Sequence, residues 1–163
     1  MSETQREPVP RNDADERDTA LAFLAFQRHC LIKKTEGLSD EQLRRVLVPS
    51  GTNLLGLVQH VIVGERWWFQ HHVAGRLLDE EFDFSMDVPA DRPSEEVFGD
   101  FRAAVAESDA IVASTELDAL TALPVDGEPK TLRWVLAHKT SEIARHAGHA
   151  DILRELIDGA TGR

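Results

Sequence analysis

The chain has a single cysteine, Cys30, among its 163 residues, so no disulfide can form within it. Disulfide frameworks are typical of small secreted domains, so a single cysteine argues against a secreted, disulfide-rich protein. The first ten residues also lack the apolar core of a secretory signal. We therefore expect a cytoplasmic protein.

Long hydrophobic runs and an excess of basic residues are missing too. The apolar run over residues 54–63 is broken by Gly56, Gln59 and His60, whereas a membrane-spanning helix needs about 20 predominantly apolar residues. Eighteen basic against twenty-nine acidic residues give a net charge of -11. A surface of this charge repels a phosphate backbone. The sequence thus predicts neither a membrane nor a nucleic-acid partner.

Helical periodicity dominates what is present. The polar start with Pro8 and Pro10 predicts a disordered N-terminal tail over residues 1–11, followed by one domain over residues 12–163. A short helix is expected over residues 39–46, with Ser39 and Gln42 at capping-box spacing. Apolar residues recur at helical spacing in four longer segments, residues 13–34, 52–74, 94–114 and 131–158.

This pattern predicts an all-α fold, a four-helix bundle with a long connection, residues 78–93, between the second and third helices. Ser50 or Thr52 can cap the second helix, and Gly159 can end the last one. The second helix is apolar in nearly all directions, which is typical of a helix enclosed by its neighbours. In such bundles, binding sites are built from side chains on facing helices.

The last predicted helix carries ionisable residues on its apolar stripe. Residues three and four apart share a helix face, so Glu142, His146 and His149 fall together with the apolar residues Ile143 and Leu153. Burying a polar group without a partner costs about 1 to 3 kcal/mol. The stripe therefore needs a partner, and a metal ion is one candidate.

His60 is the residue that can complete such a site, because it interrupts the most apolar stretch of the second helix. If its face meets that of Glu142 and His146, two imidazoles and one carboxylate converge. This is a ligand set of catalytic sites for zinc and other first-row divalent ions. Two alternatives stay open: His60 as a hydrogen-bonded core residue, and Glu142 with His146 as an ordinary ion pair one turn apart.

Several other residues are expected to have structural roles. Trp67 and Trp68 are expected to pack in the core. Glu65 is interpreted as part of a solvated or salt-linked helix face. His72 is expected at the surface or an edge, and His138 in helix packing.

Three segments, residues 57–60 (LVQH), 65–69 (ERWWF) and 142–155 (EIARHAGHADILRE), resemble the DinB/YfiT-like superfamily of metal-dependent enzymes. The resemblance is to its actinobacterial branch, related to the N-terminal domains of mycothiol-dependent maleylpyruvate isomerases, and it spans the chain from Asp15 onward. It implies a divalent ion, zinc or nickel, held by His60, Glu142 and His146. The superfamily usually has histidine in place of Glu142, but those isomerases also have glutamate there.

The resemblance also implies thiol-dependent chemistry, that is, a transferase or isomerase that joins a low-molecular-weight thiol such as mycothiol to a small electrophile. His149 is expected to orient a ligand or to carry a proton. A metal-dependent hydrolase, with His149 or Glu142 handling the proton, and a non-catalytic metal-binding or structural bundle are the alternatives. Cys30 is not expected to be a nucleophile. The many apolar directions of the second helix suggest a homodimer.

Overall fold

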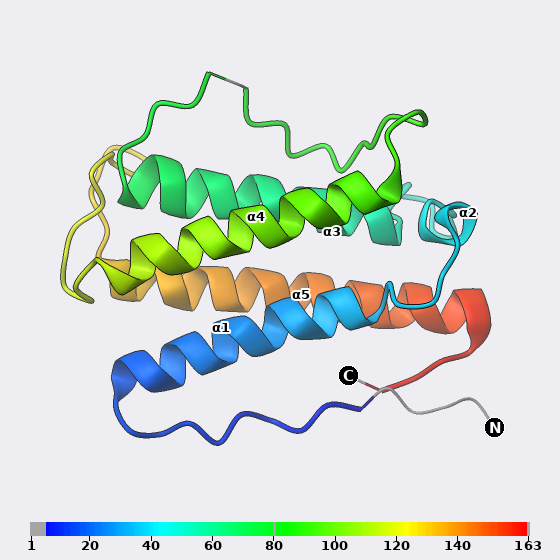
Figure 1. Cartoon of the computed structure of the whole chain (residues 1–163), viewed down its shortest axis with the longest axis horizontal. Helices are drawn as coiled ribbons and strands as arrows, with labels where there is room; N and C mark the ends of the chain where they lie inside the picture. The colour runs from blue at the N-terminus through cyan, green and yellow to red at the C-terminus, as the bar shows by residue number, and fades with distance from the viewer. Residues whose placement is uncertain (1–5, 80, 163) are drawn as a thin grey trace.

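The computed structural model describes residues 6–79 and 81–162, and it is built from helices that lie side by side (Figure 1). The β-structure of these residues is limited to isolated bridges, among them Leu120 with Thr131 and Val125 with Glu128. The prediction of an all-α bundle with a long connection after the second long helix is confirmed. The helices are α1 (Glu16–Lys33), α2 (Asp40–Leu43), α3 (Leu54–Glu65), η1 (Arg66–Val73), α4 (Ser94–Ala113) and α5 (Leu132–Asp158).

Short polar side chains cap most of these helices. Ser39 and Gln42 form the predicted capping box at α2. The predicted cap of α3 is wrong, because Asn53, rather than Ser50 or Thr52, accepts a hydrogen bond from the backbone N–H of Gly56 at 2.9 Å. All three residue types can cap, and only the one directly before the first turn reaches the free amides.

The core surrounds α3, which packs against α4 and α5, while α1 packs against α5. Ten of the twelve residues of α3 are buried, and the exceptions are Gln59 and His60. The predicted enclosure of this helix is therefore confirmed. His60 is left at the edge of the core, on the side of α3 that meets α5.

The second half of the predicted helix differs from the prediction. Residues Arg66–Val73 form a π-helix, η1, in which N–H groups bond to carbonyls five residues back. The N–H of Ala74 still donates to the carbonyl of Phe69 at 2.9 Å. This wider winding carries two tryptophans and two histidines, and apolar periodicity alone does not distinguish it from an α-helix.

The connection between η1 and α4 crosses the outside of α3 (Figure 1). It is seated at Gly56, where a Cβ atom would lie only 2.5 Å from the backbone oxygen of Met86. Met86 itself has a φ of 67°, which is rare for a residue with a side chain. Gly56 therefore makes room for the connection to pass close to the backbone of α3.

A buried ion pair joins α1 to α3. Glu65 is fully buried, and its two oxygens accept hydrogen bonds from Nε and Nη2 of Arg28 at 2.9 and 2.6 Å. Burial alone would lower the pKa of Arg28, but the carboxylate of Glu65 outweighs this and raises it. The expected solvated position of Glu65 is wrong, whereas the expected salt link is present.

The predicted tail lies partly outside the described residues. Residues 6–11 have no regular secondary structure, and Glu7 accepts a hydrogen bond from Lys33 of α1. The disorder predicted over residues 1–11 stays a prediction. In the part of the chain that the structure describes, every helix is too short or too polar to cross a membrane.

Candidate metal centre

His60 on α3 and Glu142 and His146 on α5 come together where the two helices meet. One potential ligand atom from each of the three residues lies within 4.8 Å of the others. Nε2 of His60 is 3.5 Å and Nε2 of His146 is 3.9 Å from Oε1 of Glu142. The two imidazole rings have centroids 4.6 Å apart. We call these three residues the candidate metal centre.

The two oxygens of Glu142 face different partners. Oε1 faces both imidazoles, while Oε2 accepts a hydrogen bond from Nζ of Lys139 at 3.0 Å and lies 4.0 Å from Nε2 of His138. One oxygen is thus held by a cation, and the other is directed at the imidazole nitrogens.

The connection fixes the tautomer of His60. Nδ1 of His60 lies 3.2 Å from the backbone oxygen of Phe84, and a carbonyl can only accept a hydrogen bond, so Nδ1 carries a proton. In the neutral ring, Nε2 then has a lone pair that points toward a carboxylate oxygen. Across the 3.5 Å between Nε2 and Oε1 of Glu142, either a proton or a metal ion can bridge the two atoms. An imidazole whose other nitrogen bonds to a carbonyl is a typical metal ligand.

Burial and charge shift the pKa values in the centre. Burial, and next the charge of His60, lower the pKa of His146 to about 4. Burial would raise the pKa of Glu142, but the hydrogen bond with His60 and the charge of Lys139 lower it to about 2. At neutral pH the centre therefore offers a neutral imidazole at His146 and an ionised carboxylate, which are the forms that bind metal ions.

The spacing of the donors also fits an ion. Two ligands each about 2.0 to 2.1 Å from a tetrahedral zinc ion lie about 3.4 Å apart, close to the 3.5 and 3.9 Å between Glu142 and the two imidazoles. Nδ1 of His146 is buried and has no hydrogen-bond partner among the described residues. Nδ1 of His146 is thus unsatisfied by the protein and available to a ligand, whereas the 3.9 Å distance to Glu142 is measured from Nε2.

Two different flanks adjoin the centre. On the side of Glu142 is an aromatic flank, where the ring of His138 stacks on Trp134 and contacts Trp68, with centroid distances of 5.1 and 4.6 Å. On the side of His146, the ring of His149 lies 5.8 Å away and borders an apolar recess of about 250 Å³. The other lining residues of the recess are Val48, Ser50, Thr52, Ile152 and Leu153.

Residues 19–159 match the family described as mycothiol-S-transferase. The chain belongs to this family. The match covers most of the chain, including the whole candidate metal centre and both flanks. Among curated proteins, none matches the chain.

Membership of the mycothiol-S-transferase family bears out the predicted resemblance, since the family is DinB/YfiT-like. It supports the transferase and mycothiol parts of the predicted function. A small-molecule substrate is consistent with such a family.

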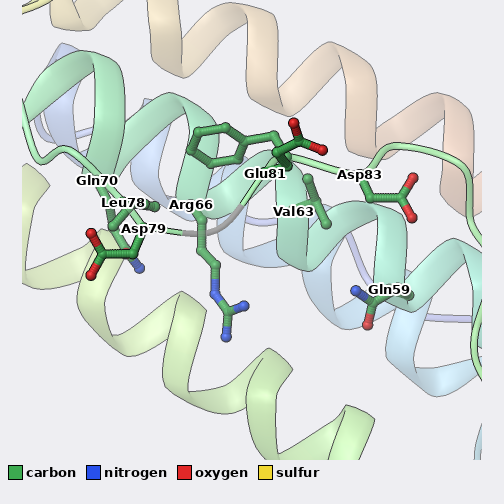
Figure 2. A pocket seen from close by; sticks show the side chains of 9 residues that line it. Gln59, Val63, Arg66, Gln70, Leu78, Asp79, Glu81 and Asp83 are labelled. Carbon is green, nitrogen blue, oxygen red and sulfur yellow. The ribbon is translucent and has the colours of Figure 1, made fainter.

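A separate cavity lies between α3, η1 and the connection that follows η1 (Figure 2). Its volume is about 490 Å³, and its described lining does not include the candidate metal centre. Figure 2 shows Arg66 and Gln59 on the helices and Glu81 and Asp83 on the connection. We therefore do not place the chemistry in this cavity. The full lining is Gln59, Val63, Arg66, Gln70, Leu78, Asp79, Glu81, Phe82 and Asp83.

The structure places the remaining predicted residues as follows. His149 is exposed and contacts His146 only through their rings. The surface position expected for His72 is wrong, because that residue is 5% exposed and packs against Trp67 and Trp68. Cys30 is buried.

The sequence analysis missed Lys139, which contacts Glu142 directly. A signal was present, because Lys139 lies four residues before Ile143 and therefore on the apolar stripe of α5. A lysine at a core-facing position needs a buried partner.

Proposed function

We propose that this member of the mycothiol-S-transferase family is a divalent-metal-dependent enzyme that transfers a thiol, mycothiol or one like it, to a small electrophile in the cytoplasm. The ion, zinc or nickel, would be held by His60, Glu142 and His146. The observation that carries the proposal is the convergence of two imidazoles and one carboxylate from two helices within 4.8 Å.

The residues around the centre have separate tasks in this proposal. A bound divalent ion would favour the deprotonated form of a thiol at neutral pH. The carbonyl of Phe84 keeps the proton of His60 on Nδ1, so that Nε2 is available as a ligand. His149 is exposed to solvent beside His146 and can carry the thiol proton away.

The two flanks support a reaction between two molecules. A transferase must hold the thiol and the electrophile side by side, whereas a hydrolase needs room for one substrate and a water molecule. The aromatic flank offers the exposed ring of Trp134, and the recess at His149 is mainly apolar. Each can hold an apolar or planar part of one reactant.

Elemental analysis tests the metal site. We expect about one equivalent of zinc or nickel in untagged protein that has never been exposed to a nickel column, and a loss of that metal in His60→Ala and His146→Ala. Gln59→Ala, next to His60 but directed at the outer cavity, is the control and should keep the metal. Equal metal content in the two histidine variants and the wild type would eliminate this centre.

Dependence on an added thiol separates transfer from hydrolysis. Turnover of an electrophile only when mycothiol is present supports the transferase. Turnover without a thiol supports a hydrolase in which His149 or Glu142 handles the proton. A protein that binds neither zinc nor nickel, and gains no thermal stability from them, would instead be a non-catalytic bundle.

We also propose that the protein forms a homodimer. Ile152 and Leu156, one turn apart on α5, are 58% and 54% exposed, and such an apolar strip is a candidate for self-association. Light scattering after size exclusion should give twice the 18.2 kDa mass of the chain. Ile152→Lys should reduce it to one chain, and an unchanged wild-type mass of one chain would exclude the dimer.

A further inference from the structure

Lys139 is a fully buried lysine in contact with the candidate metal centre. Its side chain has no exposed surface, and its Nζ lies 3.0 Å from Oε2 of Glu142. Buried ion pairs are often replaced by apolar residues without loss of stability. A lysine at this position is therefore not needed for packing alone, which raises the question of what its charge does.

Gly64 of α3 provides the space for this lysine. A Cβ atom at Gly64 would lie 2.6 Å from Nζ of Lys139, closer than Cβ atoms in proteins approach other heavy atoms. The next atoms that such a Cβ would meet belong to the carboxylate of Glu142, at 3.5 and 3.9 Å. The glycine on α3 and the lysine on α5 thus form one arrangement around the carboxylate.

We propose that Lys139 is a positioning residue for the metal ligand Glu142, an inference that rests on the proposed function. By holding Oε2, Lys139 leaves Oε1 as the single oxygen directed at His60 and His146. Its positive charge also offsets the negative charge of the carboxylate. The charges of Lys139 and Glu142 cancel, and neutral imidazoles add none, so a divalent ion in this centre would keep its two positive charges. An anionic thiolate binds best to a centre with such a charge.

Cobalt provides the readout, because the visible absorption of Co²⁺ reports its coordination number. The purified full chain is loaded with Co²⁺ alone, and 2-mercaptoethanol is then titrated while the sulfur-to-cobalt charge-transfer band is followed. In Lys139→Met, Oε2 is released and can also bind the ion. We expect a weaker visible absorption, typical of a higher coordination number, and an affinity for 2-mercaptoethanol reduced by about tenfold or more.

Lys34 is the matched control. It is also a fully buried lysine in an ion pair, with its Nζ 3.1 Å from Asp151. Lys34→Met removes a buried charge elsewhere in the bundle, so it should lower the melting temperature but keep the wild-type cobalt spectrum and thiol affinity. An equal loss of thiol affinity in both lysine variants would reduce Lys139 to a structural residue and overturn the proposal.

Gly64→Ala separates the position of the charge from its presence. The added methyl group displaces the ammonium of Lys139 without removing it, so thiol affinity should fall in the wild-type background. In the Lys139→Met background the same change should have no further effect, because the two residues act through one contact. An equal effect of Gly64→Ala in both backgrounds would contradict the arrangement.

The outcomes also distinguish this inference from the proposed function. Wild-type protein that binds Co²⁺ while Lys139→Met retains the wild-type spectrum and thiol affinity overturns the role of Lys139 and leaves the metal centre intact. Wild-type protein that takes up no Co²⁺ overturns the metal centre, and the role of Lys139 with it.

Discussion

Glu65 and Glu142 are both carboxylates at helix positions that face the core, but their surroundings differ. Glu65 is fully buried, and a single guanidinium, that of Arg28, binds both of its oxygens. The side chain of Glu142 is 20% exposed, and its oxygens face different groups. A carboxylate whose oxygens are both satisfied by one partner is a structural link. One with an oxygen directed at two imidazoles can still accept a ligand.

Breaking the ion pair between Glu65 and Arg28 should have the largest effect on the free energy of unfolding. Glu65→Gln leaves the charge of Arg28 buried, with only the half-exposed Asp109 as its partner, and we expect a loss of about 3 to 5 kcal/mol in the free energy of unfolding. Urea denaturation measures this loss. The folded fraction should still bind metal in the wild-type ratio. Asp109→Asn is the control and should cost less than about 1 kcal/mol.

Removing the charge of Glu142 should weaken metal binding, which removing the charge of Glu65 should not. Glu142→Gln removes a negative ligand, so zinc affinity measured by calorimetry should fall at least about 100-fold, the upper end of what losing a group behind a ligand costs. Without metal, Glu142→Gln also leaves the buried charge of Lys139 with an uncharged partner, so we expect a loss of stability of the same kind as in Glu65→Gln. A comparable zinc affinity in Glu142→Gln and wild type would remove the distinction between the two carboxylates.

The pH dependence of stability sharpens the comparison. The pKa of His146 is about 4 in the folded protein and near 6.5 in the unfolded chain, so the folded state binds fewer protons between these values. Stability from this group is complete above pH 6.5 and is lost as the pH falls toward 4. The lowered pKa of Glu142, about 2, adds a loss below pH 4.5.

We therefore expect the melting temperature of chelator-treated protein to fall as the pH drops from 6.5 to 4. His146→Asn should flatten this part of the curve, while Asp109→Asn, far from the centre in sequence, should leave it unchanged. If the curve of His146→Asn has the same slope as that of the wild type, the burial of a neutral imidazole at this position is refuted.

The smallest effect is expected at the aromatic flank. Trp134 is 40% exposed, and its ring also packs on Trp68 and His138, so Trp134→Ala should lower the free energy of unfolding by about 1 to 2 kcal/mol. If this ring holds a reactant, the same change should raise one KM by a few fold and leave metal content as it was. The result that supports binding at this flank is a change in one KM without a change in the other. Unchanged KM values for both reactants would exclude the flank from binding.

The bundle and the convergence of its polar residues could be predicted because both depend on periodicity. Apolar spacing places His60, Glu142 and His146 on core-facing stripes, and facing stripes in a bundle meet. The exchange of histidine for glutamate at position 142 did not prevent this, since both residue types bind first-row ions. The apolar spacing predicted the helix face on which each side chain lies.

Apolar spacing could not predict contacts to backbone atoms, nor could it predict the π-helix. The bond from His60 to the carbonyl of Phe84 depends on the path of the connection, which has no periodicity. The π-helical winding of η1 brings His72 inward, whereas spacing alone suggested an edge position. The full burial of Glu65 depends on Arg28, which is 37 residues away in sequence.

The seat of the connection on α3 has a practical consequence for anyone who wants to alter this protein. Surface segments between helices are usually the first choice for inserting a tag, a reporter or extra residues. Here Met86 lies against Gly56, and the carbonyl of Phe84 bonds to the ring of His60, so lengthening the segment near these residues would remove the hydrogen bond that orients His60. Extra sequence is safer in the hairpin turn at Asp126 and Gly127, which lies before α5 and supplies none of the contacts to the centre.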